Sequence, residues 1–283
     1  MTEISGGARL AGVMGWPVAH SLSPRLHGYW LTKYRIDGAY VPMPAKPENF
    51  EAALRALPKL GFAGVNVTVP HKEAAFACAD TADELARRLG AANTLIFRDD
   101  GSIDAHNTDG YGFIESLRAH ERGLHIDGGP ALVVGAGGSA RAVVAALIGA
   151  GVPEVRVANR TKARAEALRD DIGGPIVTID WGERLSALGD AALVVNATTQ
   201  GLRGQPPLDL PLDNLPPEAL VCDLVYAPLV TPLLAEAKRR GHRTVDGLGM
   251  LLYQGRPGFT AWFGVEPTID EALRRHVLAG LNL

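Results

Sequence analysis

The chain has 283 residues, of which 47% are hydrophobic and 21% charged, the balance of a globular protein with one large or two medium-sized domains. The net charge is -3 without a long basic run, which argues against nucleic acid as a partner, and the longest apolar run, 142–152, contains glycines and is too short to span a membrane. Cys78 and Cys222 have no further ligands at metal-binding spacing, and the first residues lack a signal-peptide pattern, so we expect no metal and a cytoplasmic location.

Short β-like runs alternate with helical patterns in the first hundred residues, which predicts an α/β fold with mainly parallel strands. The expected strands cover residues 10–15, 39–44, 65–70 and 93–97. A helix is expected from Pro24 to Arg35, because Ser23 suits a helix N-cap and Pro24 the first helical position. Pro47 opens a second helical pattern that runs to Leu60.

A second α/β unit begins after the first hundred residues. A helical pattern runs from Tyr111 to Arg122, the glycines and proline at 128–130 are typical of a turn, and 131–134 reads as a buried strand. The proline-rich stretch 205–219 predicts a loop, and helical patterns begin again near Met250.

The strand expected at 131–134 runs directly into a glycine-rich turn, Gly135-Ala136-Gly137-Gly138-Ser139-Ala140. This G-x-G-x-x-A pattern between a strand and a helix is that of a dinucleotide-binding turn. Its glycines allow backbone N–H groups to approach a pyrophosphate, and the N-terminus of the next helix favours that anion. Taken alone, the pattern also fits a tight turn without a ligand.

The end of the next expected strand, 155–159, indicates which dinucleotide is bound. NAD-dependent enzymes place an acidic residue there to bind the ribose 2′-hydroxyl. This chain has Arg160 instead, and Arg164 follows one helical turn later. Arginine suits a phosphate dianion, so the pattern predicts NADP rather than NAD. The alternative is that both arginines belong to a solvated helix start.

Three segments before residue 110 are rich in small polar residues beside predicted strand ends. They are 20–24, 66–72, and 93–94 together with 107–110. Alternation puts Asn66 and Thr68 on one face of the strand at 65–70 and its three valines on the other. Because ligands of open α/β sheets bind at the carboxyl ends of strands, these segments predict a site for a small polyhydroxylated acid. Helix capping and turn formation would explain only some of these residues.

Lys72 is the candidate for acid–base chemistry in these segments. Reduction of a carbonyl requires a proton for the developing alkoxide, and a positioned lysine or aspartate can supply it. The residue type alone is better explained as a surface lysine. His20, His71 and His106 flank the same segments, and for each a structural role is the simpler interpretation.

Taken together, these segments resemble the shikimate dehydrogenase family. Its motifs occur in the family's order from about residue 10 to 265, as GWPVAHSLSPRLH, GVNVTVPHKEAA, GAANTL, HNTDGYGF, GAGGSAR, NRTKAR, NATTQG, CDLVYAPLVTPLL and DGLGMLLYQ. The resemblance implies the reversible, NADP-dependent reduction of 3-dehydroshikimate to shikimate, a step in chorismate and aromatic amino acid biosynthesis.

The resemblance also implies roles for individual residues. The catalytic pair would be Lys72 and Asp109. Substrate contacts would come from this pair and from Ser21, Ser23, Thr68, Asn93, Tyr226 and Gln254. Cofactor contacts would come from Gly135, Ala136, Gly137, Gly138, Ser139, Ala140, Asn159, Arg160, Thr161, Arg164 and Gly247.

The family's architecture implies two α/β domains with a cleft between them. Residues 1–108 plus 246–283 would form a discontinuous substrate-binding catalytic domain, and residues 109–245 a Rossmann-type NADP-binding domain. The expected partners are shikimate and 3-dehydroshikimate, without nucleic acid or membrane, and the expected assembly is a monomer or homodimer.

One stretch departs from the family's pattern. The family usually continues a helix with small residues after the position of Gln254, but here Gly255-Arg256-Pro257-Gly258 follows. Glycine and proline disfavour the helix interior, so we expect this helix to break or kink, which makes the position of Gln254 uncertain.

Three other functions remain open. The first is a quinate/shikimate dehydrogenase that uses NAD, against which Arg160 argues. The second is a non-catalytic, cofactor-binding regulator of the same fold, which should have lost Lys72 or Asp109. The third is a dehydrogenase of similar shape that acts on another small acid, against which the paired serines and the Asn/Thr/Asp set argue.

Overall fold

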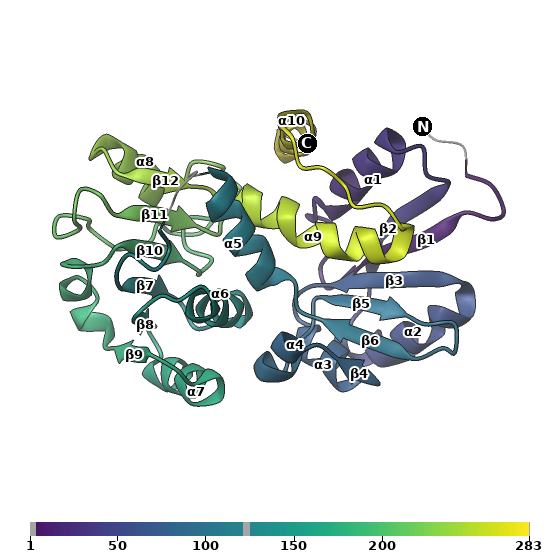
Figure 1. The fold of residues 1–283 in the computed structure, drawn as a ribbon, viewed down its shortest axis with the longest axis horizontal. Helices are drawn as coiled ribbons and strands as arrows, with labels where there is room; N and C mark the ends of the chain where they lie inside the picture. The colour runs from purple at the N-terminus through teal and green to yellow at the C-terminus, as the bar shows by residue number, and fades with distance from the viewer. Residues whose placement is uncertain (1–3, 121–124, 283) are drawn as a thin grey trace. The chain divides into compact units, whose positions relative to one another are not determined.

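The computed structural model describes residues 4–120 and 125–282, and internal contacts divide the chain into two units (Figure 1). The first unit comprises residues 1–108 and 252–283, and the second comprises residues 109–251. The domain boundary predicted at 245/246 lies just before helix α9 (Gly247–Phe263), whereas the two units divide within that helix.

The first unit contains a mixed sheet and the helices around it. Its elements are β1 (Arg9–Gly15), α1 (Ser23–Lys33), β2 (Gly38–Pro44), η1 (Pro47–Asn49), α2 (Phe50–Ala56), η2 (Pro58–Leu60), β3 (Phe62–Val67), α3 (Lys72–Ala77), β4 (Thr81–Ala82), α4 (Glu84–Leu89), β5 (Thr94–Phe97), β6 (Ile103–His106), most of α9, α10 (Glu271–Leu278) and η5 (Ala279–Asn282), where η marks a 3-10 helix. The strand order is β2-β1-β3-β5-β6-β4. β5 runs antiparallel to both of its neighbours, while the remaining pairs are parallel.

The second unit is built on a fully parallel sheet. Its elements are α5 (Asp109–His120), β7 (Ala131–Val134), α6 (Gly138–Gly149), β8 (Val155–Ala158), α7 (Lys162–Ile172), β9 (Ile176–Ile179), η3 (Trp181–Glu183), η4 (Ser186–Leu188), β10 (Leu193–Asn196), β11 (Leu220–Asp223), α8 (Pro232–Arg239), β12 (Arg243–Val245) and the start of α9. The strand order β12-β11-β10-β7-β8-β9 is that of a doubly wound dinucleotide-binding fold. The order reverses between β7 and β10, and at this switch point such folds bind their ligand.

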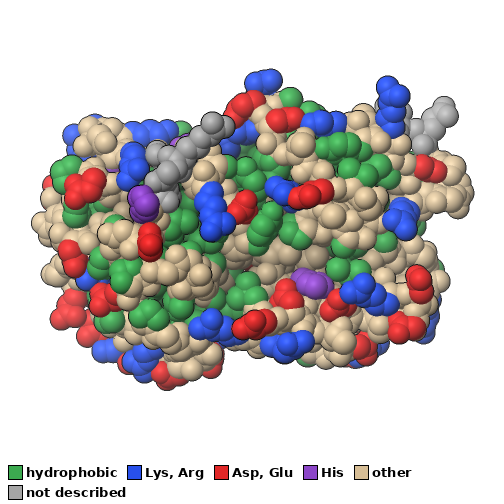
Figure 2. Space-filling model, in the orientation of Figure 1, with side chains coloured by type: hydrophobic (Ala, Val, Ile, Leu, Met, Phe, Trp, Pro, Cys, Tyr) green, Lys and Arg blue, Asp and Glu red, His purple; other side chains and the backbone are tan. Residues whose placement is uncertain are grey.

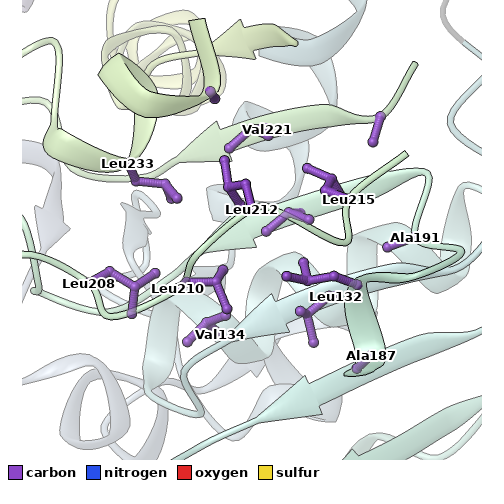
Figure 3. Packing of buried hydrophobic residues seen from close by; sticks show 14 of the residues in the cluster. Leu132, Val134, Ala187, Ala191, Leu208, Leu210, Leu212, Leu215, Val221 and Leu233 are labelled. Carbon is purple, nitrogen blue, oxygen red and sulfur yellow. The ribbon is translucent and has the colours of Figure 1, made fainter. Parts of the chain in front are cut away.

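The connection between β10 and β11 contains no helix, although a parallel crossover usually does. The stretch 205–219 is irregular, as predicted, but it is not a solvated loop. Its leucines pack against β7, β11 and α8 in the buried cluster shown in Figure 3. Those leucines are Leu208, Leu210, Leu212 and Leu215, each at most 9% exposed. Spaced leucines in an irregular segment therefore bury this face of the sheet where a helix would otherwise do so.

The predicted strands and helices of the first unit are confirmed in outline, with local differences. Ser23 is the first residue of α1 and provides no side-chain cap, so its predicted role as N-cap is wrong. The helix predicted over 47–60 is divided into η1, α2 and η2. β3 ends at Val67, and Val69 is exposed rather than on the buried face, because the chain turns at residues 69–70 before α3.

The sequence predicts a break or kink at residues 255–258. The prediction of a break is wrong, because α9 is continuous through Pro257. The glycines allow close packing within the first unit: a Cβ at Gly255 would lie 3.0 Å from Leu26 Cδ2 and 3.2 Å from His27 Nε2 of α1. The hydroxyl of Thr260 donates to the carbonyl of Arg256 at 2.9 Å, a further hydrogen bond within the helix. Tertiary packing thus overrides the low helix propensity of this stretch.

The surface carries charges of both signs. Figure 2 shows Lys and Arg side chains interspersed with Asp and Glu on the face drawn. Among the described helices, none is both long enough and apolar enough to cross a membrane.

His27 is buried in an aromatic cluster between α1, β2 and α9. It is 0% exposed and stacks on Tyr40 with ring centroids 3.9 Å apart, and Trp30, Phe259 and Trp262 surround it. Within the described residues, neither of its ring nitrogens has a hydrogen-bond partner. Burial lowers the pKa of His27 to about 3, because the charged imidazolium would lose its hydration without gaining a partner.

His27 should make the fold sensitive to acid. In the unfolded chain His27 is protonated below about pH 6.5, whereas in the folded chain it is protonated only below about pH 3. The contribution of His27 to stability is therefore intact above pH 6.5 and is lost progressively as the pH falls below that value. The free energy of unfolding should fall by about 1.4 kcal/mol per pH unit in that window from this group alone. Urea denaturation between pH 6.5 and 4.5 measures the fall in the free energy of unfolding. This fall should be smaller in His27→Phe and unchanged in His20→Gln, which replaces an exposed histidine. Parallel curves for His27→Phe and the unchanged protein would contradict this account.

Candidate functional site

The loops that follow β1 and β3 are joined by backbone hydrogen bonds. The Thr68 N–H donates to the Met14 carbonyl at 2.9 Å, and the Trp16 N–H donates to the Val69 carbonyl at 3.1 Å. β1 and β3 are parallel neighbours, so both loops leave the same edge of the sheet. The loop with the two candidate serines and the loop with the candidate lysine therefore start side by side.

The antiparallel direction of β5 adds a third segment to this edge. Asn66 of β3 pairs with Thr94 of β5, which pairs in turn with His106 of β6. The start of β5 and the end of β6 therefore lie beside the end of β3. The prediction that the polar segments lie at the carboxyl ends of strands is wrong for Asn93, which comes just before the start of β5.

Asn93 joins segments that are distant in the sequence. Its side chain is 3% exposed; Oδ1 accepts a hydrogen bond from the Thr108 N–H at 2.8 Å, and Nδ2 donates to Oε1 of Gln254 at 3.4 Å. The hydroxyl of Thr108 donates to the backbone carbonyl of Gln254 at 2.9 Å. These bonds anchor α9 to the edge of the sheet at Gln254. The candidate substrate residues Asn93 and Gln254 are therefore in contact.

A buried tyrosine extends this network toward α1. The hydroxyl of Tyr40 donates to Asn66 Oδ1 at 2.6 Å and is hydrogen-bonded with the side chain of Ser23. Asn66 Nδ2 donates to the Thr94 hydroxyl at 3.0 Å. Burial raises the pKa of Tyr40, which keeps it protonated as a donor. Sequence analysis did not identify Tyr40, because a tyrosine within a strand is usually a core residue.

The candidate lysine is held through its backbone. Lys72 begins α3, and its carbonyl accepts a hydrogen bond from the Ala92 N–H at 2.9 Å. The preceding His71 is 2% exposed, stacks on Phe50 and is bonded through Nε2 to the carbonyl of Ala45 at 2.7 Å. His71 thus anchors the start of α3.

The other two flanking histidines differ in their environment. His20 is exposed. His106 lies between two carboxylates, with Nδ1 3.3 Å from Asp83 and Nε2 3.1 Å from Asp104. The hydrogen bond with Asp83, followed by that with Asp104, raises the pKa of His106 above its usual value. Asp83 also caps α4 and accepts from the Asn107 N–H, so His106 supports the segment that leads to Thr108.

The glycine-rich turn of the second unit follows β7 at the switch point of the sheet. Gly135 has a φ of +117°, and a Cβ there would lie 3.0 Å from the carbonyl oxygen of Ala197, so this position requires glycine. At Gly137 and Gly138 a Cβ would meet no protein atom within 4 Å. α6 begins here without a side-chain cap. Backbone without side chains at an uncapped helix start is the arrangement that lets an anion approach the N–H groups.

The loop after β8 presents two arginines to solvent. The side-chain amide of Asn159 donates to the carbonyl of Thr161 at 2.8 Å and so shapes the turn before α7. Arg160 and Arg164 are exposed, and neither guanidinium has a hydrogen bond or ion pair with any residue that the structure describes. Their neighbour Lys162 is paired with Asp180 at 2.7 Å. The two arginines are therefore available to an external anion.

The remaining candidates of the second unit lie on other segments. Tyr226 follows β11, and burial raises its pKa. Gly247 begins α9, and a Cβ there would overlap the carbonyl of Leu224, so close backbone packing explains this glycine without a ligand. Asp109 is the first residue of α5, is 6% exposed and directly follows Thr108 in the chain.

The structure thus groups the candidates by unit. Those of the first unit are Ser21, Ser23, Thr68, Lys72, Asn93 and Gln254. Those of the second unit are Asp109, Gly135, Ala136, Gly137, Gly138, Ser139, Ala140, Asn159, Arg160, Thr161, Arg164, Tyr226 and Gly247.

Two family models match the chain. One, described as the shikimate dehydrogenase substrate binding domain, matches residues 13–95. The other, described as shikimate/quinate 5-dehydrogenase, matches residues 118–202.

Similar proteins cover nearly the whole chain. Shikimate dehydrogenase (NADP(+)) of Paramagnetospirillum magneticum is 57% identical over 98% of this chain and 100% of its own length. The structure of shikimate 5-dehydrogenase from Thermus thermophilus in complex with NADP(H) and shikimate is 39% identical, with a TM-score of 0.84, and covers 97% of this chain and 98% of that one. Quinate dehydrogenase from Corynebacterium glutamicum in complex with NAD is 30% identical, with a TM-score of 0.89, and covers 98% of this chain and 99% of that one.

Proposed function

Because this chain belongs to the shikimate dehydrogenase family, we propose that it catalyses the reversible, NADP-dependent reduction of 3-dehydroshikimate to shikimate. The observation that carries the proposal is the buried contact of Asn93 with Thr108 and Gln254, because it brings three of the family's motifs to one edge of a sheet beside the loop of Lys72. A small polyhydroxylated acid needs such a set of neutral donors and acceptors next to a cation.

The second unit fits NADP. The open space at Gly137 and Gly138 and the uncapped start of α6 would hold the pyrophosphate, with Ala136, Ser139 and Ala140 completing the turn. Arg160 and Arg164 would bind the 2′-phosphate, with Asn159 and Thr161 shaping their loop. NADPH, when bound, supplies the hydride for the ketone carbon.

The chain's own residues supply the proton and hold the substrate. As hydride reaches the ketone carbon, negative charge develops on the oxygen, and Lys72 donates the proton that neutralises it. The resemblance assigns Asp109 as the partner of Lys72: its carboxylate would hold the ammonium and contact the neighbouring hydroxyl of the substrate. Ser21 and Ser23 bind the carboxylate, while Thr68, Asn93, Gln254 and Tyr226 bind from around the ring. We further propose a cytoplasmic location, since both cysteines are unpaired and buried. The assembly we propose is a monomer or homodimer.

A steady-state assay tests the function. Shikimate with NADP should give the highest kcat/KM among the four pairings of shikimate or quinate with NADP or NAD, because the exposed Arg160 favours the 2′-phosphate. A kcat/KM for quinate with NAD that equals or exceeds the kcat/KM for shikimate with NADP would favour a quinate dehydrogenase. Cofactor binding without turnover of either acid would indicate a regulator.

Arg160→Ala should weaken NADP binding by about 1.5–3 kcal/mol, as expected for loss of a charge-assisted hydrogen bond, and should barely change NAD binding. Calorimetric titration with both cofactors measures this difference. The control is Lys162→Ala, which removes a neighbouring cation that is already paired with Asp180. Equal losses for the two cofactors would show that Arg160 does not recognise the 2′-phosphate.

Lys72→Ala should lower kcat by about 10²–10⁴-fold and leave the KM for shikimate within a small factor, since a general acid acts mainly in the transition state. Asp109→Asn should lower kcat as well, and the two losses should be less than additive because the residues act together. Lys59→Ala, at an exposed lysine, serves as the control. A raised KM with normal kcat in Lys72→Ala would show that Lys72 binds the substrate but does not donate the proton.

A further inference from the structure

Asp223, at the end of β11, is a buried carboxylate that the proposed mechanism does not use. It is 1% exposed, and its two oxygens accept hydrogen bonds from three donors. Oδ1 accepts from the Val225 N–H at 2.9 Å and from Asn196 Nδ2 at 3.0 Å, and Oδ2 accepts from the Thr231 hydroxyl at 2.6 Å. Taking a carboxylate out of water is costly, so such a group persists where its bonds are well made.

The partners of Asp223 belong to the two segments that follow β10 and β11. Asn196 ends β10, and its Oδ1 accepts from the N–H and the hydroxyl of Thr198 at 3.0 and 2.7 Å. Thr231 is the N-cap of α8 and accepts from the Leu234 N–H. Asp223 thereby joins the turn after β10 to the end of the segment between β11 and α8.

The segment 223–231 is also fixed along its length. The Leu224 N–H donates to the Asn196 carbonyl at 2.9 Å, and the carbonyl of Ala227 accepts from the Arg203 N–H at 2.8 Å. The backbone of Leu224 lies so close to Gly247 that no Cβ fits between them. Tyr226 lies between these fixed points, and its hydroxyl has no hydrogen-bond partner among the described residues.

We propose that Asp223 is a positioning residue that holds the segment 223–231 so that the hydroxyl of Tyr226 is presented to the substrate. Asp223 touches neither substrate nor cofactor in this arrangement; it acts through its bonds to Val225 and Thr231, on either side of Tyr226. The inference rests on the proposed function for the identity of the substrate.

Asp223→Asn tests the carboxylate with little change of volume. Asparagine keeps one acceptor oxygen but replaces the oxygen that faces Thr231 with an NH₂ group. We expect the KM for shikimate to rise about tenfold, while kcat and the KM for NADP stay within about threefold, the pattern of a lost ground-state contact. Thr231→Ser keeps the hydroxyl and should behave as the unchanged protein. Asp190→Asn, which disrupts the Arg156 ion pair of the same unit, controls for general destabilisation.

A double-mutant cycle with Tyr226→Phe separates positioning from a merely structural role. If Asp223 acts through Tyr226, the double variant should be at most about twofold worse than the poorer single variant. Losses that multiply, or an unchanged KM for shikimate in Asp223→Asn or Tyr226→Phe, would overturn the inference.

Amide hydrogen exchange of residues 223–231 tests the positioning role independently of the proposed function, because the measurement does not require turnover. Exchange should become faster in Asp223→Asn and stay unchanged in Thr231→Ser. Faster exchange in a protein that never turns over shikimate would reject the proposed function alone. Unchanged exchange in an active enzyme would reject the positioning role alone.

Discussion

The side-chain amide of Asn93 is buried at the edge of the first sheet, where only 3% of the residue is exposed to solvent. Its oxygen and its nitrogen are bonded to Thr108 and Gln254, which lie 15 and 161 positions away in the sequence. An unpaired amide at this depth would cost about 1–3 kcal/mol, so the end of β6, the start of β5 and α9 are held together at one point. The proposed substrate residues of the first unit depend on that junction, and Tyr40 and Asn66 extend it toward Ser23.

The proposed function requires the second unit to bind a multiply charged anion. Backbone N–H groups would bind it where side chains are absent, at Gly137 and Gly138, and the exposed arginines of the loop after β8 would supply full positive charge. Only Gly135 is glycine for a conformational reason, since its φ is positive and the Ala197 carbonyl lies against it. The three glycines of one motif thus serve two distinct physical ends.

Buried polar groups in this chain also show how position can be determined at a distance from the chemistry. Asp223 and Asn93 each accept hydrogen bonds from a backbone N–H next to a candidate site residue, that of Val225 beside Tyr226 and that of Thr108 beside Asp109. His27, by contrast, is equally buried and has no hydrogen-bond partner among the described residues, so its neutral ring contributes packing against Tyr40 and makes the fold sensitive to acid. Burial of a polar group therefore has opposite consequences according to whether its partners are present.

The sequence by itself determined the α/β class, most strand positions and the glycine-rich turn, and it predicts a phosphate site at Arg160, because each depends on a short stretch whose residue types restrict the backbone or the charge locally. Only the tertiary structure decided that β5 runs antiparallel and brings Asn93 to the site, that α9 continues through Pro257, and that leucines of an irregular stretch replace a crossover helix. These features depend on partners far away in the chain, such as Gln254 for Asn93 and Leu26 for Gly255. Local propensity is worth about 1 kcal/mol or less for most residues, so packing and the pairing of buried polar groups outweigh it wherever the two disagree.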